Sequence, residues 1–266
     1  ADVIAGVDMV IGVQGPQLAD LPGIKAGTIL AAIQSPFTDR AKIDAYAGAG
    51  LIAYAMELMP RTTRAQSMDV LSSQSNLAGY KAVIDAGEAY GRAFPMMMTA
   101  AGTVPAAKVF IMGVGVAGLQ AIATARRLGA IVSATDVRKA TEEQVKSLGA
   151  KFVYADIADA ATSGGYAKEL TAEDKAKQAA LVAAHVKTQD VIITTALIPG
   201  RPAPVLITQE MVESMKPGSI IVDLAVERGG NCPLSKPDQI VEHNGVRIVG
   251  TVNLAGKLAG NAAPLF

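Results

Sequence analysis

Three glycines and one aspartate within residues 108–138 have the types and the spacing that can bind a dinucleotide. Gly113, Gly115 and Gly118 follow an apolar run and open a helical stretch, in the pattern G-x-G-x-x-G. The first glycine permits a tight turn, the second lets a pyrophosphate approach the backbone, and the third lets the helix pack close to the strand. The N–H groups at the start of that helix would face the phosphates. Asp136 ends the next apolar run, roughly 20 residues on, where a carboxylate can hold both ribose hydroxyls of an adenosine.

The residues around Asp136 bear on which dinucleotide would bind. A carboxylate there favours NAD(H) over NADP(H), because the 2′-phosphate of NADP(H) would face a negative charge. Arg138 tempers this preference, since a nearby arginine could accommodate the phosphate. A guanidinium stacked on the adenine face is an equally good interpretation. The pattern therefore predicts an NAD(H) site and leaves the role of Arg138 open.

A second polar segment, residues 60–83, is crowded with side chains of fixed hydrogen-bonding capacity. Helical spacing from residue 67 onward puts Asp69, Ser72 and Asn76 near one face. On periodicity alone, the favoured interpretation is a solvated helix N-terminus at which Asp69 complements the helix dipole. The alternative is a group of side chains that orients a ligand.

The composition narrows the class of protein. Half of the 266 residues are apolar, only 4% are aromatic and tryptophan is absent, as in parallel α/β proteins whose strands are covered on both faces. The formal net charge is zero, which gives no sign of nucleic-acid binding or of a polybasic membrane anchor. The single cysteine, Cys232, cannot form an internal disulfide and indicates a reducing cytosol. The most hydrophobic run, residues 109–125, is broken by glycines and is better explained as a strand and a buried helix than as a membrane span.

The elements that must position these residues alternate between strand and helix. Toward the N-terminus, we expect strands at 8–13, 28–33 and 51–56, and helices at 35–48 and 67–94. In the remainder of the chain, we expect strands at 109–112, 131–135, 151–155, 190–196, 219–225 and 246–251, and helices at 119–129, 141–149, 171–187 and 207–218. Thr141 and Gln144 have the spacing of a capping box for the second of these helices. Residues 96–108 are expected to form a loop.

This alternation predicts an α/β fold, in which a doubly wound parallel sheet of the Rossmann type binds NAD(H) and is preceded by a partial second α/β domain. We expect the partial first domain at residues 1–72 and the NAD(H)-binding domain at 73–254. Residues 255–266 would begin a segment that returns to the first domain.

Ligands on such sheets lie at the carboxyl ends of the strands. The glycine turn, Asp136 and the loops after Thr195 and Leu224 should therefore surround one crevice. The loop at residues 156–170 is rich in small side chains and has Tyr166 near its centre. It is long enough to be either disordered or a functional lid.

Four motifs together resemble one family along essentially the whole chain. They are RAQSMDVLSSQSNLAGY, KVFIMGVGVAGLQA, TTALIPGRPAPVLIT and VDLAVERGGNCP. The resemblance is to the NAD(H)-binding component (domain I, in the alpha subunit) of proton-translocating NAD(P) transhydrogenases, with alanine dehydrogenases as structural cousins in the same superfamily. Members have a longer N-terminal region and continue past the point that matches Phe266. We therefore expect a piece of a longer protein, as the absence of an initiator methionine also indicates.

The resemblance implies roles at the nicotinamide end of the cofactor. Asp69 and Ser72 would orient the ring carboxamide, with Arg61 assisting. Gln66 would reach toward the partner that carries NADP(H). Transhydrogenation would then be a direct hydride transfer between NADH and NADP⁺.

The resemblance also implies contacts along the rest of the cofactor. Asp136 would bind the adenosine ribose, with Val137 and Arg138 beside the adenine. The other implied contacts are Gly113, Gly115, Val116, Ala117 and Gly118 at the pyrophosphate, Tyr166 on a mobile loop that closes on the nucleotide, Thr195, Ala196 and Leu197 in the loop under the cofactor, and Asn253. The tail NLAGKLAGN departs from the family by lacking the proline that often follows the Asn-apolar pair.

A positioned acid or base is missing from this inventory. A dehydrogenase that acts on an amino or hydroxy acid moves a proton with the hydride and needs such a group. The only histidines are His185, late in a predicted helix, and His243, in a polar turn, and we expect both at the surface. Where alanine dehydrogenases would have a lysine and a histidine, this chain has Gln14 and, by approximate alignment, Gln34. Hydride transfer between two nicotinamide rings needs only proximity, orientation and the exclusion of water.

The leading hypothesis is therefore the NAD(H)-binding component of a transhydrogenase. It implies a homodimer that docks an NADP(H)-binding domain and a membrane-spanning component, on the inner side of the bacterial cytoplasmic membrane. We expect no metal, no nucleic acid and no direct membrane span. The alternatives are an alanine-dehydrogenase-like oxidoreductase and a non-catalytic NAD-binding module.

Overall fold

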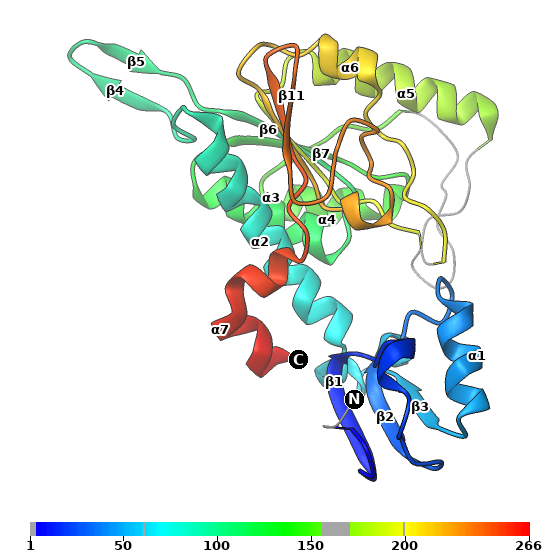
Figure 1. Ribbon diagram of the computed structural model, residues 1–266. Helices are drawn as coiled ribbons and strands as arrows, with labels where there is room; N and C mark the ends of the chain where they lie inside the picture. Colours follow the sequence, from blue (N-terminus) through cyan, green and yellow to red (C-terminus); the bar gives the residue numbers. More distant parts are fainter. Residues whose placement is uncertain (1–3, 61, 156–170, 199) are drawn as a thin grey trace. The chain divides into compact units, whose positions relative to one another are not determined.

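The computed structural model describes the chain at residues 4–60, 62–155, 171–198 and 200–266, with Lys175 in its backbone only. Contacts divide it into two compact units (Figure 1). The first unit is Ala1–Gln74 with Ala263–Phe266, and the second unit is Ser75–Ala262. Among the described residues, no helix is long and apolar enough to cross a membrane. Within the same ranges, no group of histidine, cysteine and acidic residues could hold a metal ion.

The first unit is a three-stranded parallel sheet in the order β1-β2-β3. Its strands are β1 (Met9–Gln14), β2 (Ile29–Ile33) and β3 (Ile52–Ala55), and helix α1 (Arg40–Gly48) connects the last two. Short 3₁₀ helices lie at Leu18–Asp20, Met56–Leu58 and Gln66–Met68. Alternate apolar side chains of β1 are exposed, at Met9, Ile11 and Val13, so the described residues leave one face of this sheet uncovered.

Helix α1 begins later than the sequence predicts. Ser35 has a left-handed φ of 55°, and the backbone N–H groups of Gln34 and Ser35 both donate to the carboxylate of Glu57. The chain therefore turns at the end of β2 instead of entering a helix. The N-terminal cap is Asp39, whose side chain accepts a hydrogen bond from the N–H of Lys42 at 3.2 Å.

The second unit is built on a seven-stranded sheet in the order β11-β12-β10-β9-β6-β7-β8. All neighbouring strands are parallel except β11 and β12. The strands are β6 (Lys108–Met112), β7 (Ile131–Thr135), β8 (Lys151–Phe152), β9 (Val191–Thr194), β10 (Ile220–Asp223), β11 (Ile240–His243) and β12 (Val246–Val249). The helices are α2 (Val70–Tyr90), α3 (Val116–Arg127), α4 (Glu142–Ser147), α5 (Ala172–Val186), α6 (Gln209–Glu213) and α7 (Ala259–Ala262).

Both faces of this sheet are covered, as β6 illustrates. Val109 and Ile111 are fully buried in a cluster with side chains of α2 and α3, whereas Phe110 and Met112 point to the other face and pack with α5 and α6 (Figure 1). Continuous apolar strands are what burial on both faces requires. The predicted α/β class with a doubly wound, Rossmann-like parallel sheet is confirmed.

One segment expected to be a loop forms a hairpin. Strands β4 (Met97–Thr99) and β5 (Gly102–Val104) pair antiparallel and project from the rest of the second unit (Figure 1). The hydroxyl of Thr99 closes the turn, because it accepts from the N–H of Ala101 and donates to the carbonyl of Gly102. The strands are mostly exposed, so they lack the buried alternation by which a sequence pattern reveals a strand. Strand β11, which is largely exposed as well, was also missed.

The predicted capping box at Thr141 and Gln144 is wrong. A 3₁₀ turn, Lys139–Thr141, precedes α4, and Thr141 keeps helical torsions. Its hydroxyl donates to the carbonyl of Arg138 at 2.8 Å and makes no cap. A residue that is already helical cannot present its side chain to the next N–H groups.

The unit boundaries differ from the expected ones. The contacts divide at 74/75 and 262/263, whereas the sequence suggested 72/73 and 254/255. Helix α2 runs through the first boundary without interruption. At the second boundary, Leu254 packs into the core of the second unit, which keeps the following residues with that unit.

His185 is not the surface residue that the sequence suggested. Its Nε2 lies 2.8 Å from the hydroxyl of Ser133, and its ring packs edge-on against Phe110 at a centroid distance of 4.6 Å. Burial lowers the pKa of His185, with Lys151 and Lys108 adding to the effect. His243 lies at the end of β11 and pairs with Glu213 at 2.9 Å.

The lowered pKa of His185 predicts a loss of stability in mild acid. The unfolded chain would bind a proton near the ordinary value of 6.5, and the folded protein only at lower pH. The free energy of unfolding should therefore decrease as the pH falls below about 6.5 and level off below the folded pKa. Urea denaturation between about pH 7.5 and 5 measures this.

The matched variants are His185→Gln and His243→Gln. His185→Gln should flatten the decrease, because glutamine keeps a polar group for Ser133 and does not titrate. His243→Gln should retain the contribution of His185. Parallel curves for the wild type and His185→Gln would contradict the assignment.

Candidate functional site

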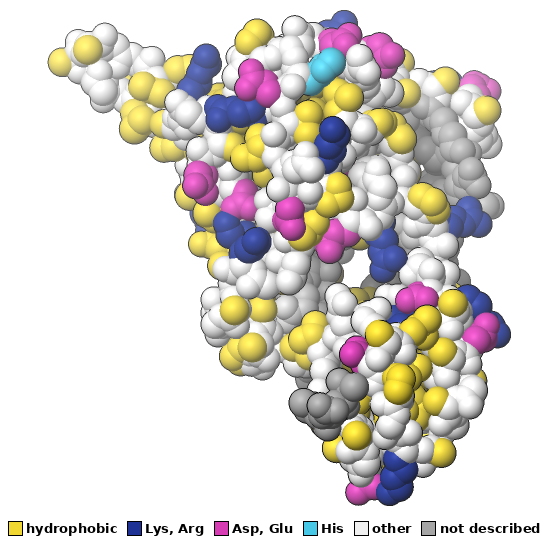
Figure 2. All heavy atoms as spheres, in the orientation of Figure 1, with side chains coloured by type: hydrophobic (Ala, Val, Ile, Leu, Met, Phe, Trp, Pro, Cys, Tyr) yellow, Lys and Arg dark blue, Asp and Glu magenta, His cyan; other side chains and the backbone are white. Residues whose placement is uncertain are grey.

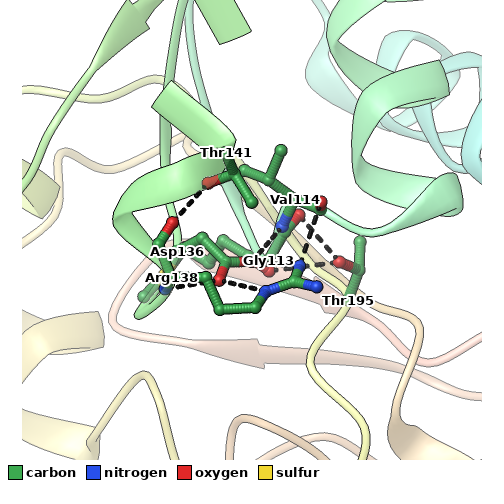
Figure 3. A network of polar contacts seen from close by, with 7 residues as sticks. Gly113, Val114, Asp136, Arg138, Thr141 and Thr195 are labelled. Carbon is green, nitrogen blue, oxygen red and sulfur yellow. Dashed lines mark hydrogen bonds and ion pairs between the residues drawn. The ribbon is translucent and has the colours of Figure 1, made fainter. Parts of the chain in front are cut away.

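The carboxyl ends of three adjacent strands bring the predicted site residues together. Met112 at the end of β6 is in register with Thr135 of β7 and with Thr194 of β9. The next residues along the chain, Gly113, Asp136 and Thr195, therefore lie side by side at one edge of the sheet (Figure 3). This is the edge at which doubly wound sheets bind ligands.

The three glycines play three different steric roles. Gly113 has a φ of 102°, and a Cβ there would lie 2.5 Å from the Thr195 hydroxyl. A Cβ on Gly118 would collide with the carbonyl oxygen of Gly113, so the helix can approach the strand only with glycine at this position. A Cβ on Gly115 would meet no atom within 4 Å. Only the middle glycine therefore faces open space.

The first turn of α3 is a place for an anion. Gly115 is the N-terminal cap and offers no side-chain acceptor, and the first N–H groups of a helix have no intrahelical partner. The N–H groups of residues 116–118 can therefore donate to an anion, with the positive end of the helix dipole behind them. A Cβ on Gly79 of α2 would collide with the carbonyl oxygen of Ala117. Helix α2 is thus packed directly against this turn and holds it in place.

Asp136 is buried, with 9% of its surface exposed, and accepts hydrogen bonds from two backbone groups. The N–H of Val114 donates to Oδ2 at 2.8 Å, and the N–H of Arg138 donates to Oδ1 at 2.9 Å. The guanidinium of Arg138 also donates to both oxygens (Figure 3). Asp136 raises the pKa of Arg138. The carboxylate therefore joins the glycine turn to the end of β7.

The loop after β9 lies beneath the glycine turn. The N–H of Thr195 donates to the carbonyl of Met112 at 2.8 Å, and its hydroxyl donates to the carbonyl of Gly113 at 3.0 Å (Figure 3). Ala196 exchanges backbone hydrogen bonds with the side chain of Asn231 at 3.1 and 2.9 Å. Leu197 is half exposed. The loop is thus fixed at both sides while an apolar side chain stays available.

Two buried polar residues that the sequence reasoning missed hold this loop. The Asp223 carboxylate, fully buried at the end of β10, accepts from the hydroxyls of Thr194 and Ser235 and from the N–H groups of Ala225 and Cys232. Asn231, also fully buried, clamps the loop after β9. The available signal was an acidic residue closing an apolar strand, followed by a Gly-Gly-Asn turn.

The other residues predicted for the cofactor have different outcomes. Val137 is half-buried beside Asp136. Asn253 has a left-handed φ of 49°, and its side-chain oxygen accepts from the N–H of Gly256 at 3.1 Å, so it caps the 3₁₀ helix Leu254–Leu258. Tyr166 and Arg61 lie outside the described residues.

The polar segment of the first unit is a helix cap. Asp69 directly precedes α2, and its carboxylate accepts from the N–H and the hydroxyl of Ser72 at 3.0 and 2.6 Å. Gln66 is exposed in the 3₁₀ turn before it. Asn76, in the second unit, is exposed and donates to Gln120 at 3.2 Å. The structure therefore brings Asp69 and Ser72 together, in the arrangement expected of an N-terminal cap.

The chain matches two family descriptions from end to end. Residues 1–78 match "Alanine dehydrogenase/PNT, N-terminal domain", and residues 82–266 match "Alanine dehydrogenase/PNT, C-terminal domain". A curated relative is the first of the polypeptides that make up the NAD(P) transhydrogenase alpha subunit of Rhodospirillum rubrum. It is 57% identical over 274 residues, which cover 100% of this chain and 71% of the relative.

Solved structures show the same likeness. The transhydrogenase from Sinorhizobium meliloti is 59% identical and superposes with a TM-score of 0.88, over 98% of this chain and 72% of that one. An L-alanine dehydrogenase is 25% identical with a TM-score of 0.78, over 98% of this chain and 68% of that one. The resemblance carried by the four motifs is confirmed. The chain belongs to the alanine dehydrogenase/PNT family, and within it to the NAD(P) transhydrogenase alpha subunits.

Proposed function

We propose that this chain binds NAD(H) and exchanges a hydride between it and an NADP(H) held by a partner domain. The observation that carries the proposal is the site at the end of β6, where a glycine open to solvent adjoins a free helix N-terminus and a buried carboxylate. Those groups match the pyrophosphate and the ribose of a dinucleotide. Family membership supports the same interpretation.

The NAD(H) would lie along this edge of the sheet. Its pyrophosphate accepts from the N–H groups of Val116, Ala117 and Gly118, and its adenosine ribose donates to Asp136. Val137 and Arg138 flank the adenine, and the loop Thr195–Leu197 supports the chain of the cofactor. Tyr166 and Asn253 are further proposed contacts, carried by the family resemblance.

The nicotinamide end is proposed to involve the polar segment of the first unit. Asp69 and Ser72 would orient the ring carboxamide, with Arg61 assisting, and Gln66 would reach toward the NADP(H) partner. Gln66 is exposed and therefore available. Because Asp69 and Ser72 already pair as a cap, their geometry is fixed before any ligand binds, and a fixed geometry favours orientation.

The chemistry asks little of the protein beyond position. The nicotinamide supplies the hydride, and direct transfer between two rings forms and breaks only C–H bonds, so no side chain must give or take a proton. What the chain provides is orientation at a distance of about 3–3.5 Å and the exclusion of water. Gln34 at the end of β2 fits this interpretation: it is fully buried, and as an amide it cannot act as an acid–base catalyst.

The proposed partners are an NADP(H)-binding domain, a membrane-spanning component and a second copy of this chain. The β4–β5 hairpin supports the last of these. Met96, Met97 and Met98 are 55%, 42% and 78% exposed, and apolar side chains lie along the projecting arm at the upper left of Figure 2. Exposed apolar patches mark interaction sites. Attachment to the inner side of the bacterial cytoplasmic membrane would be through the partners.

Alanine substitution at two of the three glycines should separate binding from folding. Gly115→Ala adds a methyl group in open space, so stability should stay within about 0.5 kcal/mol while the affinity for NADH falls at least about tenfold. Gly118→Ala should lower the free energy of unfolding by about 1–3 kcal/mol, because its methyl group meets backbone. NADH fluorescence titration and urea denaturation measure the two effects. Unchanged NADH affinity in Gly115→Ala would place the cofactor elsewhere.

A mixing assay should reveal the hydride exchange. With a transhydrogenase NADP(H)-binding domain added, the protein should reduce an NAD⁺ analogue with NADH in the presence of NADP(H). Gln66→Asn and Asp69→Asn should each lower the rate at least about tenfold. Gln239→Asn, the same change at another exposed glutamine, is the control. Unchanged rates in Gln66→Asn and Asp69→Asn would remove this segment from the mechanism.

The same assay separates the rival functions. NADH formation from NAD⁺ and L-alanine, with no partner present, would indicate the alanine-dehydrogenase-like alternative. NADH binding without any exchange in the mixture would indicate a non-catalytic module.

A further inference from the structure

The Asp136 carboxylate is saturated with donors in the free protein. A carboxylate offers about four lone-pair sites on its two oxygens. Oδ1 accepts from the N–H and the Nε of Arg138, both at 2.9 Å. Oδ2 accepts from the N–H of Val114 at 2.8 Å and from an Nη of Arg138 at 2.9 Å. A ribose therefore cannot donate two hydroxyl groups to Asp136 unless two of the present donors leave.

Only the guanidinium of Arg138 can leave. The N–H of Val114 belongs to the tight turn at Gly113, and the N–H of Arg138 belongs to the backbone that follows β7. The guanidinium sits at the end of a rotatable side chain that is 21% exposed, against 7% for the side chain of Asp136. Its further bond, from Nη to the carbonyl of Val114 at 3.1 Å, breaks in the same movement.

Resting on the proposed function, we infer that Arg138 occupies the two positions on Asp136 that the 2′- and 3′-hydroxyls of the adenosine ribose take. Each binding event then exchanges two donors of a guanidinium for two hydroxyl donors. The exchange conserves the number of hydrogen bonds to the carboxylate. It replaces charge-assisted bonds from a cation with bonds from a neutral diol, which are weaker.

Arg138 is thus a positioning residue that acts on the nucleotide through Asp136. In the free protein it neutralises a buried carboxylate, which would otherwise be costly. In the binding step it offsets most of what the ribose hydroxyls contribute to affinity. A displaceable guanidinium keeps a tightly shaped site exchangeable, which suits a component that must release oxidised nucleotide on every turnover.

A ligand-by-variant cycle tests this directly. The ligands are ADP and 2′,3′-dideoxy-ADP, which share the adenine and the pyrophosphate and differ only in the ribose hydroxyls. The proteins are the wild type, Arg138→Ala, and Arg127→Ala as the control, because Arg127 is an exposed arginine on α3. Calorimetric titration gives the ratio of the two dissociation constants for each protein.

The ratio should be small in the wild type and in Arg127→Ala, and at least about tenfold larger in Arg138→Ala, since bonds to a charged group are worth about 1.5–3 kcal/mol once nothing competes for them. Loss of adenine stacking in Arg138→Ala would affect both ligands equally and cancel in the ratio. Equal ratios in all three proteins would overturn the inference. If Arg138→Ala does not fold, Arg138→Gln carries the same expectation.

The failure of the proposed function has a different signature. If neither ADP nor NADH binds the wild type, the site itself is wrong, and the inference falls with it. If ADP binds and its hydroxyls contribute equally with and without Arg138, the site stands and only the exchange is refuted.

Discussion

The close packing of backbone against backbone around the glycine turn is the constraint on which the rest of this molecule depends. The helix α3 reaches strand β6 only because Gly118 has no side chain between it and the carbonyl of Gly113. On its other side, α2 reaches α3 only because Gly79 leaves room for the carbonyl of Ala117. Small changes in well-packed backbone cannot be absorbed by rotamers. The helix N-terminus is therefore held where a pyrophosphate needs it.

Polar groups buried at the adjoining strand ends extend this rigidity across the sheet. Thr195 bonds to the turn itself, Asn231 bonds to the loop that follows Thr195, and Asp223 ties down the segment that carries Asn231. Each of these groups is satisfied by partners, as buried polar groups must be. Loops on either side of the crevice thus form one hydrogen-bonded network. The network leaves Gly115 and the first N–H groups of α3 as the region open to a ligand.

Features that depend on local pattern and backbone geometry could be predicted from sequence, and features that depend on neighbours could not. The glycine roles and the position of Asp136 follow from chain geometry, and strand register then brings them together. The β4–β5 hairpin lacks a buried face and so gave no pattern. The capping box at Thr141 failed because a 3₁₀ turn precedes α4. The pairing of Arg138 with Asp136 left no periodic trace, since two residues close in sequence can pair or not.

Amide chemical shifts during an NADH titration test the central claim most directly, because they report the proposed anchor itself. The account predicts that the N–H signals of Gly115, Val116, Ala117 and Gly118 move most, and that ADP moves the same signals. Nicotinamide mononucleotide, which lacks the adenosine half and the pyrophosphate, should leave them near their free positions. Saturable NADH binding that left these four signals unmoved would contradict the account.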